Sequence, residues 1–406
     1  MEKTFLQFAK ENFFIILVGL YPAALVAGTA VSEMINLILI ISFLSNCYIH
    51  KNWSWVKDRI FLWLLIIYFY LVANSLFSNY PEQSYERAIG FIRFPILIFA
   101  ISFVFKAKKN SEKIIFGMWF AILAFLIFDL YYEVIFGHNL VGYQSPWSDR
   151  LSGMMFEELK IAHLLIGFSL PTLFFIFESD KNTKKFIISI IVFSIILILT
   201  GERANTLKGL FVIFLSFLLY KNKFFQIKKV YLFFFIIIFS VLIYTKPNIH
   251  QRYYLEISNA WKNSNSSIFN LVKNSNYGPH YQIAWSIFQN YPIFGSGVKT
   301  FRIECRKKAY SEYNGCTTHP HQLYLEFLSE IGLVGFLLFV SFFVYILFRA
   351  KKYLLKNQNG AVLCSALYVF ALNIPLLPSG SFFTSFGATI FWINIAIITK
   401  SIKNDE

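Results

Sequence analysis

The sequence is poor in charged residues, which fill 15% of its 406 positions, whereas hydrophobic residues fill 57% and aromatic residues 20%. Soluble domains of this length carry about a quarter charged residues. The shortage of charge excludes a soluble globular enzyme, a disordered chain and a fibre. Acidic residues are scarcer than basic ones, 22 against 37. The net charge of +15 could indicate nucleic-acid binding, but the basic residues lie in short loops between apolar runs, as in a multi-pass membrane protein.

Cysteine is also scarce. Four Cys in a chain of this length form neither a disulfide framework nor a zinc site. Cys47 and Cys364 fall within apolar runs, where a thiol behaves as a small apolar residue. Cys305 and Cys316 lie in one large loop, and we predict a disulfide between them if that loop faces an oxidising compartment. Two free thiols are the alternative.

Apolar runs of roughly the length that a bilayer requires recur along the chain. The twelve runs cover residues 13–31, 34–50, 60–78, 88–105, 114–132, 160–177, 186–200, 205–220, 230–245, 328–348, 361–377 and 385–399. The long segment 246–327 contains aromatic and apolar residues at helical spacing, so we expect it to be folded. We therefore predict an all-α polytopic membrane protein. Helices 1–9 would lie in 1–245, a large, partly helical loop in 246–327, and helices 10–12 in 328–406.

Lysine and arginine are distributed differently. Twenty Lys lie in alternate loops and at the two termini, and the positive-inside rule assigns these loops and both termini to the cytoplasm. Only two of the nine Arg share that side, and the rest are Arg87, Arg93, Arg150, Arg203, Arg252, Arg302 and Arg306. Because the guanidinium group suits bidentate phosphate recognition, we expect an anionic ligand on the outer face. Random Arg usage with local ion pairs is the alternative.

The sequence His319-Pro320-His321 comes directly before a predicted membrane-entering helix. Pro320 fixes the backbone and keeps His319 out of that helix, so His321 lies near the helix start at the outer mouth of the bundle. A His side chain titrates near neutrality and can act as a general base. We predict that His321 is the catalytic base. A structural role and a metal pair are the alternatives, but two His without Cys or clustered acids make a poor zinc site.

Three motifs resemble those of the bacterial O-antigen ligase family. His321-Gln322, nine residues and then Gly332-x-x-Gly335 looks like the family signature. The segment 291–297 resembles the P-x-x-G-x-G turn that precedes this His in ligases and related polysaccharide polymerases, and 199–204 resembles their arginine-bearing turn. The ligase-like region covers about residues 185–345.

The resemblance implies an inverting glycosyltransferase without metal or other cofactor. It would move a glycan linked to undecaprenyl diphosphate onto lipid A–core, at the periplasmic face of the bacterial inner membrane. His321 would deprotonate the acceptor hydroxyl. A polymerase that joins lipid-linked repeat units is the first alternative, because Phe336 and Leu337 replace a hydroxyl-bearing pair often found in ligases. A flippase or transporter is the second, although the chain has no internal repeat or matched pair of broken spans.

The resemblance also implies cationic ligands for the diphosphate. Arg203 matches the family's arginine, Arg93 lies deep in a predicted span, and Arg150 resembles an R-x-x-G segment of the family. Each could instead have a structural role. Arg203 could pair with Glu202 or with lipid headgroups. Arg93 could pair with Asp129 or Glu133, and Arg150 with Asp149, Glu157 or Glu158.

The chain departs from the family at one position. Many members carry an arginine where this chain has Tyr281. We expect His280 or Arg252 to take its place as a ligand of the diphosphate, with His319 as a further contact to the substrate.

Overall fold

A computed structural model of the chain describes residues 12–179, 183–220 and 236–402, apart from positions 238, 243, 266 and 376. Its regular elements are all helices over this part of the chain, and seven helical stretches are long and apolar enough to cross a membrane. They are α4 (Thr29–Ile49), α5 (Arg59–Leu76), α6 with α7 (Pro81–Gly90 and Arg93–Lys106), α8 (Ser111–Phe136), α9 (Ile161–Ser179), α18 (Leu323–Lys356) and α20 (Ser385–Ile402). The predicted all-α membrane class is confirmed.

Shorter helices occupy four more of the predicted runs. They are α2 (Phe13–Gly19), α3 (Tyr21–Ala27), α10 (Thr183–Leu199), α11 (Arg203–Leu219) and α19 (Gly360–Leu372). The first run holds two helices rather than one, because Pro22 has no N–H to donate and Gly28, at φ 131°, ends α3. The run 230–245 lies largely outside the described residues. The total of twelve spans therefore stays a prediction.

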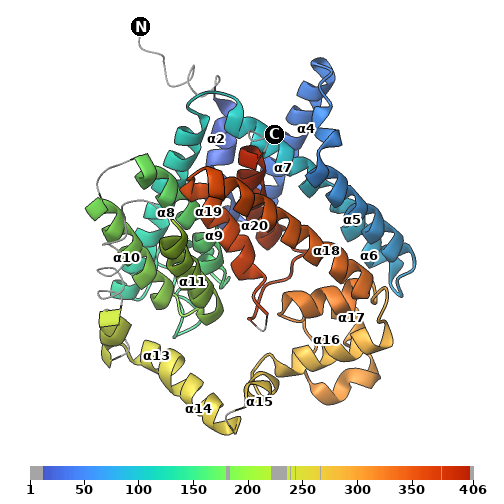
Figure 1. The fold of residues 1–406 in the computed structure, drawn as a ribbon. Coiled ribbons are helices and arrows are strands. Elements are labelled where there is room, and N and C mark those ends of the chain that lie inside the picture. Colours follow the sequence, from blue (N-terminus) through green and yellow to red (C-terminus); the bar gives the residue numbers. More distant parts are fainter. Residues whose placement is uncertain are drawn as a thin grey trace.

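The core of the bundle surrounds α20, which lies in its middle (Figure 1) and packs against α7, α9, α18 and α19. Trp392 of α20 is fully enclosed, with the rings of Phe91, Phe94 and Phe342 centred about it at 5.8, 6.0 and 6.1 Å. Helices nearer the periphery leave large apolar side chains exposed, such as Phe128 on α8. A helix that is apolar on all sides belongs inside such a bundle, whereas one exposed apolar face suits contact with lipid.

Residues 246–327, called here the outer segment, fold into short helices as predicted. They are α13 (Pro247–His250), α14 (Glu256–Asn263), α15 (Ile268–Lys273), α16 (Gly278–Asn290) and α17 (Phe301–Glu304). A separate small core holds the second half together, with Ile283, Ile287, Phe301 and Tyr310 among its buried side chains. Figure 1 shows α13, α14 and α15 as an arch that reaches from the α11 side of the bundle to α16, at the end opposite to the C-terminus.

Candidate active site

The two glycine motifs are halves of one backbone arrangement. Gly332 interrupts α18 with φ 64° and ψ −172°, which leaves backbone groups on both sides of the break without helical partners. The turn at 291–297 supplies those partners. Ser296 N donates to Ser329 O at 2.9 Å, Gly297 N donates to Glu330 O at 2.8 Å, and Leu333 N donates to the carbonyl of residue 292 at 2.9 Å. The turn is therefore locked into the break in α18.

Glycine is required where the turn meets the break. Gly295 has φ 73°, and a Cβ there would lie 2.5 Å from the nitrogen of Gly332. A Cβ on Gly332 would lie 2.5 Å from the nitrogen of Gly295. Neither contact is possible between real atoms, so the two motifs depend on each other for their close approach.

The His-Pro-His turn lies at the start of α18. Gln322 is the N-cap, and its Oε1 accepts a hydrogen bond from Leu325 N at 2.7 Å. His321 precedes it in a left-handed conformation, φ 57°, which is unusual for a residue with a side chain. Its carbonyl accepts from Ser379 N at 2.9 Å, so the segment between α19 and α20 holds the turn in place. A strained backbone that its surroundings enforce is common at active sites.

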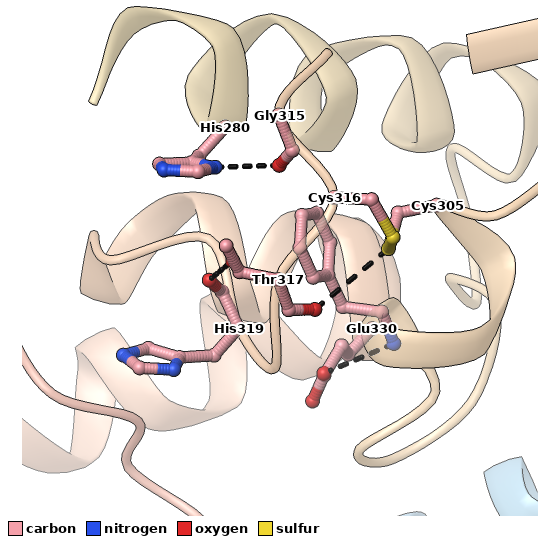
Figure 2. Close-up of a disulfide and its surroundings, with 8 residues drawn as sticks. His280, Cys305, Gly315, Cys316, Thr317, His319 and Glu330 are labelled. Carbon is pink, nitrogen blue, oxygen red and sulfur yellow. Dashed lines mark hydrogen bonds between the residues drawn. A yellow bond between two sulfur atoms is a disulfide. The ribbon is translucent and has the colours of Figure 1, made fainter. Parts of the chain in front are cut away.

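Aromatic and imidazole rings cluster around His321. The ring centroids of His319, His280 and Tyr277 lie 4.0, 5.2 and 5.3 Å from that of His321. Nδ1 of His280 lies within hydrogen-bond distance of Gly315 O (Figure 2). A carbonyl only accepts, so Nδ1 carries a proton. The structure thus brings together all three predicted His residues.

Burial keeps two of these imidazoles neutral. It lowers the pKa of His321 to about 3, with a further contribution from the neighbouring His residues. Burial, and then the charge of Lys299, lower the pKa of His319 to about 4. Nδ1 of His319 lies 3.0 Å from the hydroxyl of Thr318, whereas its buried Nε2 has no hydrogen-bond partner among the described residues. Both rings are therefore unprotonated at neutral pH.

The predicted disulfide joins the two sides of this site. Cys305 and Cys316 are bonded, with their Cα atoms 5.2 Å apart. The bridge ties the end of α17 to the segment that leads into His319. In Figure 2 the rings of His280 and His319 point to the same side, away from the disulfide.

A cavity of about 510 Å³ lies beside His319 and is strongly cationic. Five cationic side chains from α6, α11, α17 and the adjoining loops line it: Arg87, Lys160, Lys208, Lys299 and Arg302. The one carboxylate among its lining residues, Glu158, is already paired with Lys160 at 2.6 Å. Such an excess of positive charge in a concave site favours an anionic ligand.

Two of these lysines are buried and fixed. Lys208 Nζ donates to the carbonyl of residue 378 at 2.7 Å. Lys299 Nζ donates to the hydroxyl of Ser381 and lies 3.7 Å from the carboxylate of Glu326. Glu326 also accepts from Phe382 N at 2.8 Å. Buried ammonium groups with so few partners keep donors available to a ligand in the cavity.

The four arginines predicted as diphosphate ligands, Arg93, Arg150, Arg203 and Arg252, do not line this cavity. Arg203 begins α11, which also supplies Lys208, but its guanidinium is paired with Glu256 at 2.9 Å and donates to Arg252 O at 3.2 Å. Arg252 is paired with Asp149 and donates to Gly201 O at 3.0 Å. Arg252 therefore holds the outer segment on the α10–α11 turn.

Arg93 is paired differently from either expected alternative. It forms an ion pair with Glu33 of α4 at 3.1 Å, so the expected pairing with Asp129 or Glu133 is wrong. Those two acids bind backbone N–H groups of the loop after α8 instead. Arg93 also approaches the Ser385 hydroxyl, on the wall of the cationic cavity, at 3.5 Å.

Arg150 likewise lacks the expected acid partner. Asp149 is taken by Arg252, and the guanidinium of Arg150 lies over the ring of Trp147, 5.7 Å from its centroid.

Sequence reasoning missed most of the residues that line the cavity. Two signals could have found them. Lys208 is an ionisable residue within an apolar run, and a charged side chain inside a membrane span usually indicates a functional site. Lys160 stands at the outer end of a predicted span, where the lysine bias would not place it. Lys299 directly follows the glycine turn, but its proximity to His319 depends on the tertiary fold.

The comparison with known families agrees with this geometry. Residues 188–340 match the family model described as O-antigen ligase. The chain matches no curated protein. The matched region contains the α10–α11 turn, the outer segment, the disulfide, the glycine turn and the His-bearing start of α18. This part of the chain, which resembles the O-antigen ligase family model, therefore supplies most of the elements described for the site.

Proposed function

We propose that the protein is a glycosyltransferase that moves a glycan from undecaprenyl diphosphate onto lipid A–core, at the periplasmic face of the bacterial inner membrane. Both termini would lie in the cytoplasm. One observation carries the proposal: the buried, neutral imidazole of His319 lines a cationic cavity, and its ring centroid lies 4.0 Å from that of His321. The family match supports the reaction type.

The residues divide the reaction between them. The imidazole of His321 accepts the proton of the acceptor hydroxyl, and the hydroxyl oxygen attacks the anomeric carbon. The bond between that carbon and the diphosphate oxygen breaks, so a single displacement inverts the configuration. Diphosphate is a good leaving group, and Lys208, Lys299 and Arg302 stabilise the charge that it gains. His319 lines the same cavity, and its buried Nε2 has no hydrogen-bond partner among the described residues.

The low pKa of His321 suits a base that works only with substrate bound. An imidazole with a pKa of about 3 is a weak base in the empty site. A diphosphate in the cationic cavity brings negative charge close to both imidazoles and raises their pKa values. Proton transfer from the acceptor then becomes favourable only once the donor is in place.

Arg203 remains a proposed diphosphate ligand at the edge of the cavity. Its ion pair with Glu256 is about one-third exposed on both sides, 35% and 36%. Exposed pairs of this kind contribute roughly 0–1 kcal/mol. A diphosphate, which offers Arg203 bidentate hydrogen bonds and a higher charge, can therefore displace Glu256.

The polymerase alternative uses the same site with a different acceptor. Phe336 and Leu337 occupy the positions after Gly335 that carry hydroxyl groups in many ligases. The lipopolysaccharide of a deletion strain distinguishes the two. Loss of a ligase leaves bare core with polymer still on the carrier lipid, whereas loss of a polymerase leaves core capped with one repeat unit.

The catalytic base is tested with purified His321→Ala enzyme. We expect transfer to fall by about 10²- to 10⁴-fold, the usual effect of losing a general base, while undecaprenyl diphosphate still binds. His138→Ala is the matched control, because this His lies in the loop after α8, outside the ring cluster. Wild-type transfer by the His321→Ala enzyme would refute the assignment.

A further inference from the structure

A second cavity, of about 290 Å³, borders the α10–α11 turn at Leu199. The end of α8, the loop at 145–151 and the start of α13 form its walls. Glu202 interacts with one residue of each cavity. Its carboxylate accepts from Asn205, a residue of the cationic cavity, at 2.7 Å and is influenced electrostatically by Arg150 of the second cavity.

The walls of this cavity combine an aromatic surface with polar groups. Trp147 is 48% exposed, and the guanidinium of Arg150 lies over its ring. Nε of Arg150 is buried and has no hydrogen-bond partner in the described part of the chain. Asp149, Ser145 and Asn248 add acceptors and donors. A Trp that only anchored the protein at a membrane interface would need neither a cavity nor an unpaired guanidinium nitrogen beside it.

This combination matches the chemistry of a sugar ring. A pyranose has an apolar face of C–H groups, which packs on an indole, and an edge of hydroxyl groups, which pair with carboxylate, amide and guanidinium groups. A free lipid tail would leave the polar groups unpaired, and a simple anion would not use the indole. The cavity therefore favours carbohydrate.

The cavity is also rigid before any ligand binds. A Cβ on Gly201 would lie 2.6 Å from the carbonyl of Asp149, so the loop packs directly on the turn. Leu151 N donates to Thr200 O at 3.2 Å, and Arg252 binds both Asp149 and Gly201 O. A preorganised site loses less conformational entropy when its ligand binds.

We propose that this second cavity is a carbohydrate subsite that holds sugar residues of the lipid-linked glycan while its diphosphate occupies the cationic cavity. The inference rests on the proposed function, since it assigns the subsite to the glycan of that reaction. Such a subsite would let the enzyme select donors by the length and composition of their glycan. Trp147 and Arg150 would act in binding, not in the chemical step.

The test compares Trp147→Ala with Trp261→Ala. Trp261 is similarly exposed, at 42%, but lies on α14 and lines neither cavity. Two donors are used, undecaprenyl diphosphate carrying one sugar and the same carrier with several repeat units. We expect Trp147→Ala to raise the ratio of KM for the long donor to KM for the short donor roughly tenfold, equivalent to about 1.4 kcal/mol. Trp261→Ala should keep the wild-type ratio.

A binding measurement separates this inference from the proposed function. The free oligosaccharide, released from its carrier lipid by mild acid, is titrated against the protein in detergent and followed by saturation-transfer NMR. Wild type and Trp261→Ala should give a signal that Trp147→Ala loses. If wild type transfers neither donor, the proposed function fails, while the NMR titration still decides the subsite. An unchanged KM ratio together with an unchanged NMR signal in Trp147→Ala would overturn the subsite.

Discussion

The close contact between Gly295 and Gly332 predicts that adding one methyl group, in Gly295→Ala, strongly destabilises the protein. Alanine at position 295 must keep φ 73°, which costs an L-residue roughly 1–2 kcal/mol. Its Cβ would also lie 2.5 Å from both the carbonyl oxygen of Glu330 and the nitrogen of Gly332. Both are backbone atoms of the broken helix, so neither can move aside as a flexible side chain would.

The relief of that clash would break hydrogen bonds. Moving the turn outward separates Ser296 N from Ser329 O and Gly297 N from Glu330 O, which are now 2.9 and 2.8 Å apart. Each buried polar group left unpaired costs about 1–3 kcal/mol. Together with the backbone cost, Gly295→Ala is expected to destabilise the protein by at least about 3 kcal/mol.

Gly142→Ala is the matched control. Gly142 also has a left-handed backbone, φ 84°, but a Cβ there would meet nothing within 4 Å. Only the conformational cost of roughly 1–2 kcal/mol applies. Thermal unfolding of the three proteins in one detergent, followed by intrinsic fluorescence, should show a much larger fall in Tm for Gly295→Ala. Equal falls in Tm would show that the turn and the break in α18 do not depend on this close approach.

Two further predictions concern charge. Arg203→Lys should bind undecaprenyl diphosphate more weakly than wild type, because lysine cannot form the bidentate hydrogen bonds of a guanidinium group. Glu256→Gln should bind it more tightly, because the ion pair that holds Arg203 is lost. Equal binding by wild type and both variants would exclude Arg203 as a ligand. The pKa values of His319 and His321 are depressed in the folded state, so their stability contribution is complete above about pH 6.5 and is lost as the pH falls toward about 4 and 3. The Tm of wild type should therefore fall between pH 7 and pH 5, and His321→Gln should fall less steeply; parallel curves would refute burial of a neutral His321.

The sequence predicted helices well, because each apolar run had to become one in a bilayer. It also located the His turn and both glycine motifs. It did not predict which helices touch, since a stretch such as α20, which is buried on every side, has no single apolar face that would indicate its partners. Arg93 shows the consequence. Nearby acids on α8 were the obvious partners, but the fold brings Glu33, 60 residues earlier in the chain, to within 3.1 Å.

The cationic cavity was hidden for the same reason. Its walls come from α6, α11, α17 and loops that are far apart in the chain, and no local pattern joins them. The distribution of Arg in the sequence predicted an anion-binding face. It could not separate Arg87 and Arg302, which line the cavity, from Arg252, which holds the outer segment on the α10–α11 turn.

The nine residues between Gln322 and Gly332 set the geometry of the site. They form the first part of α18, and at 1.5 Å per residue they span about 13 Å. The N-cap positions His321 at one end, and the break receives the glycine turn at the other. One residue more or fewer would rotate one end by about 100° relative to the other.

The glycine turn and the segment around Ser379 connect the two ends of this short helix. From the break, the glycine turn leads to Lys299, whose N–H donates to the Glu330 carboxylate at 2.7 Å. The ammonium group of Lys299 reaches Ser381, two residues after Ser379, and Ser379 N in turn binds the carbonyl of His321. The spacing of the motif therefore fixes the His turn and a buried cation on the same cavity. A base and a positive charge must both be close to the anomeric carbon when the diphosphate leaves, and this closed arrangement sets their separation before the substrate arrives.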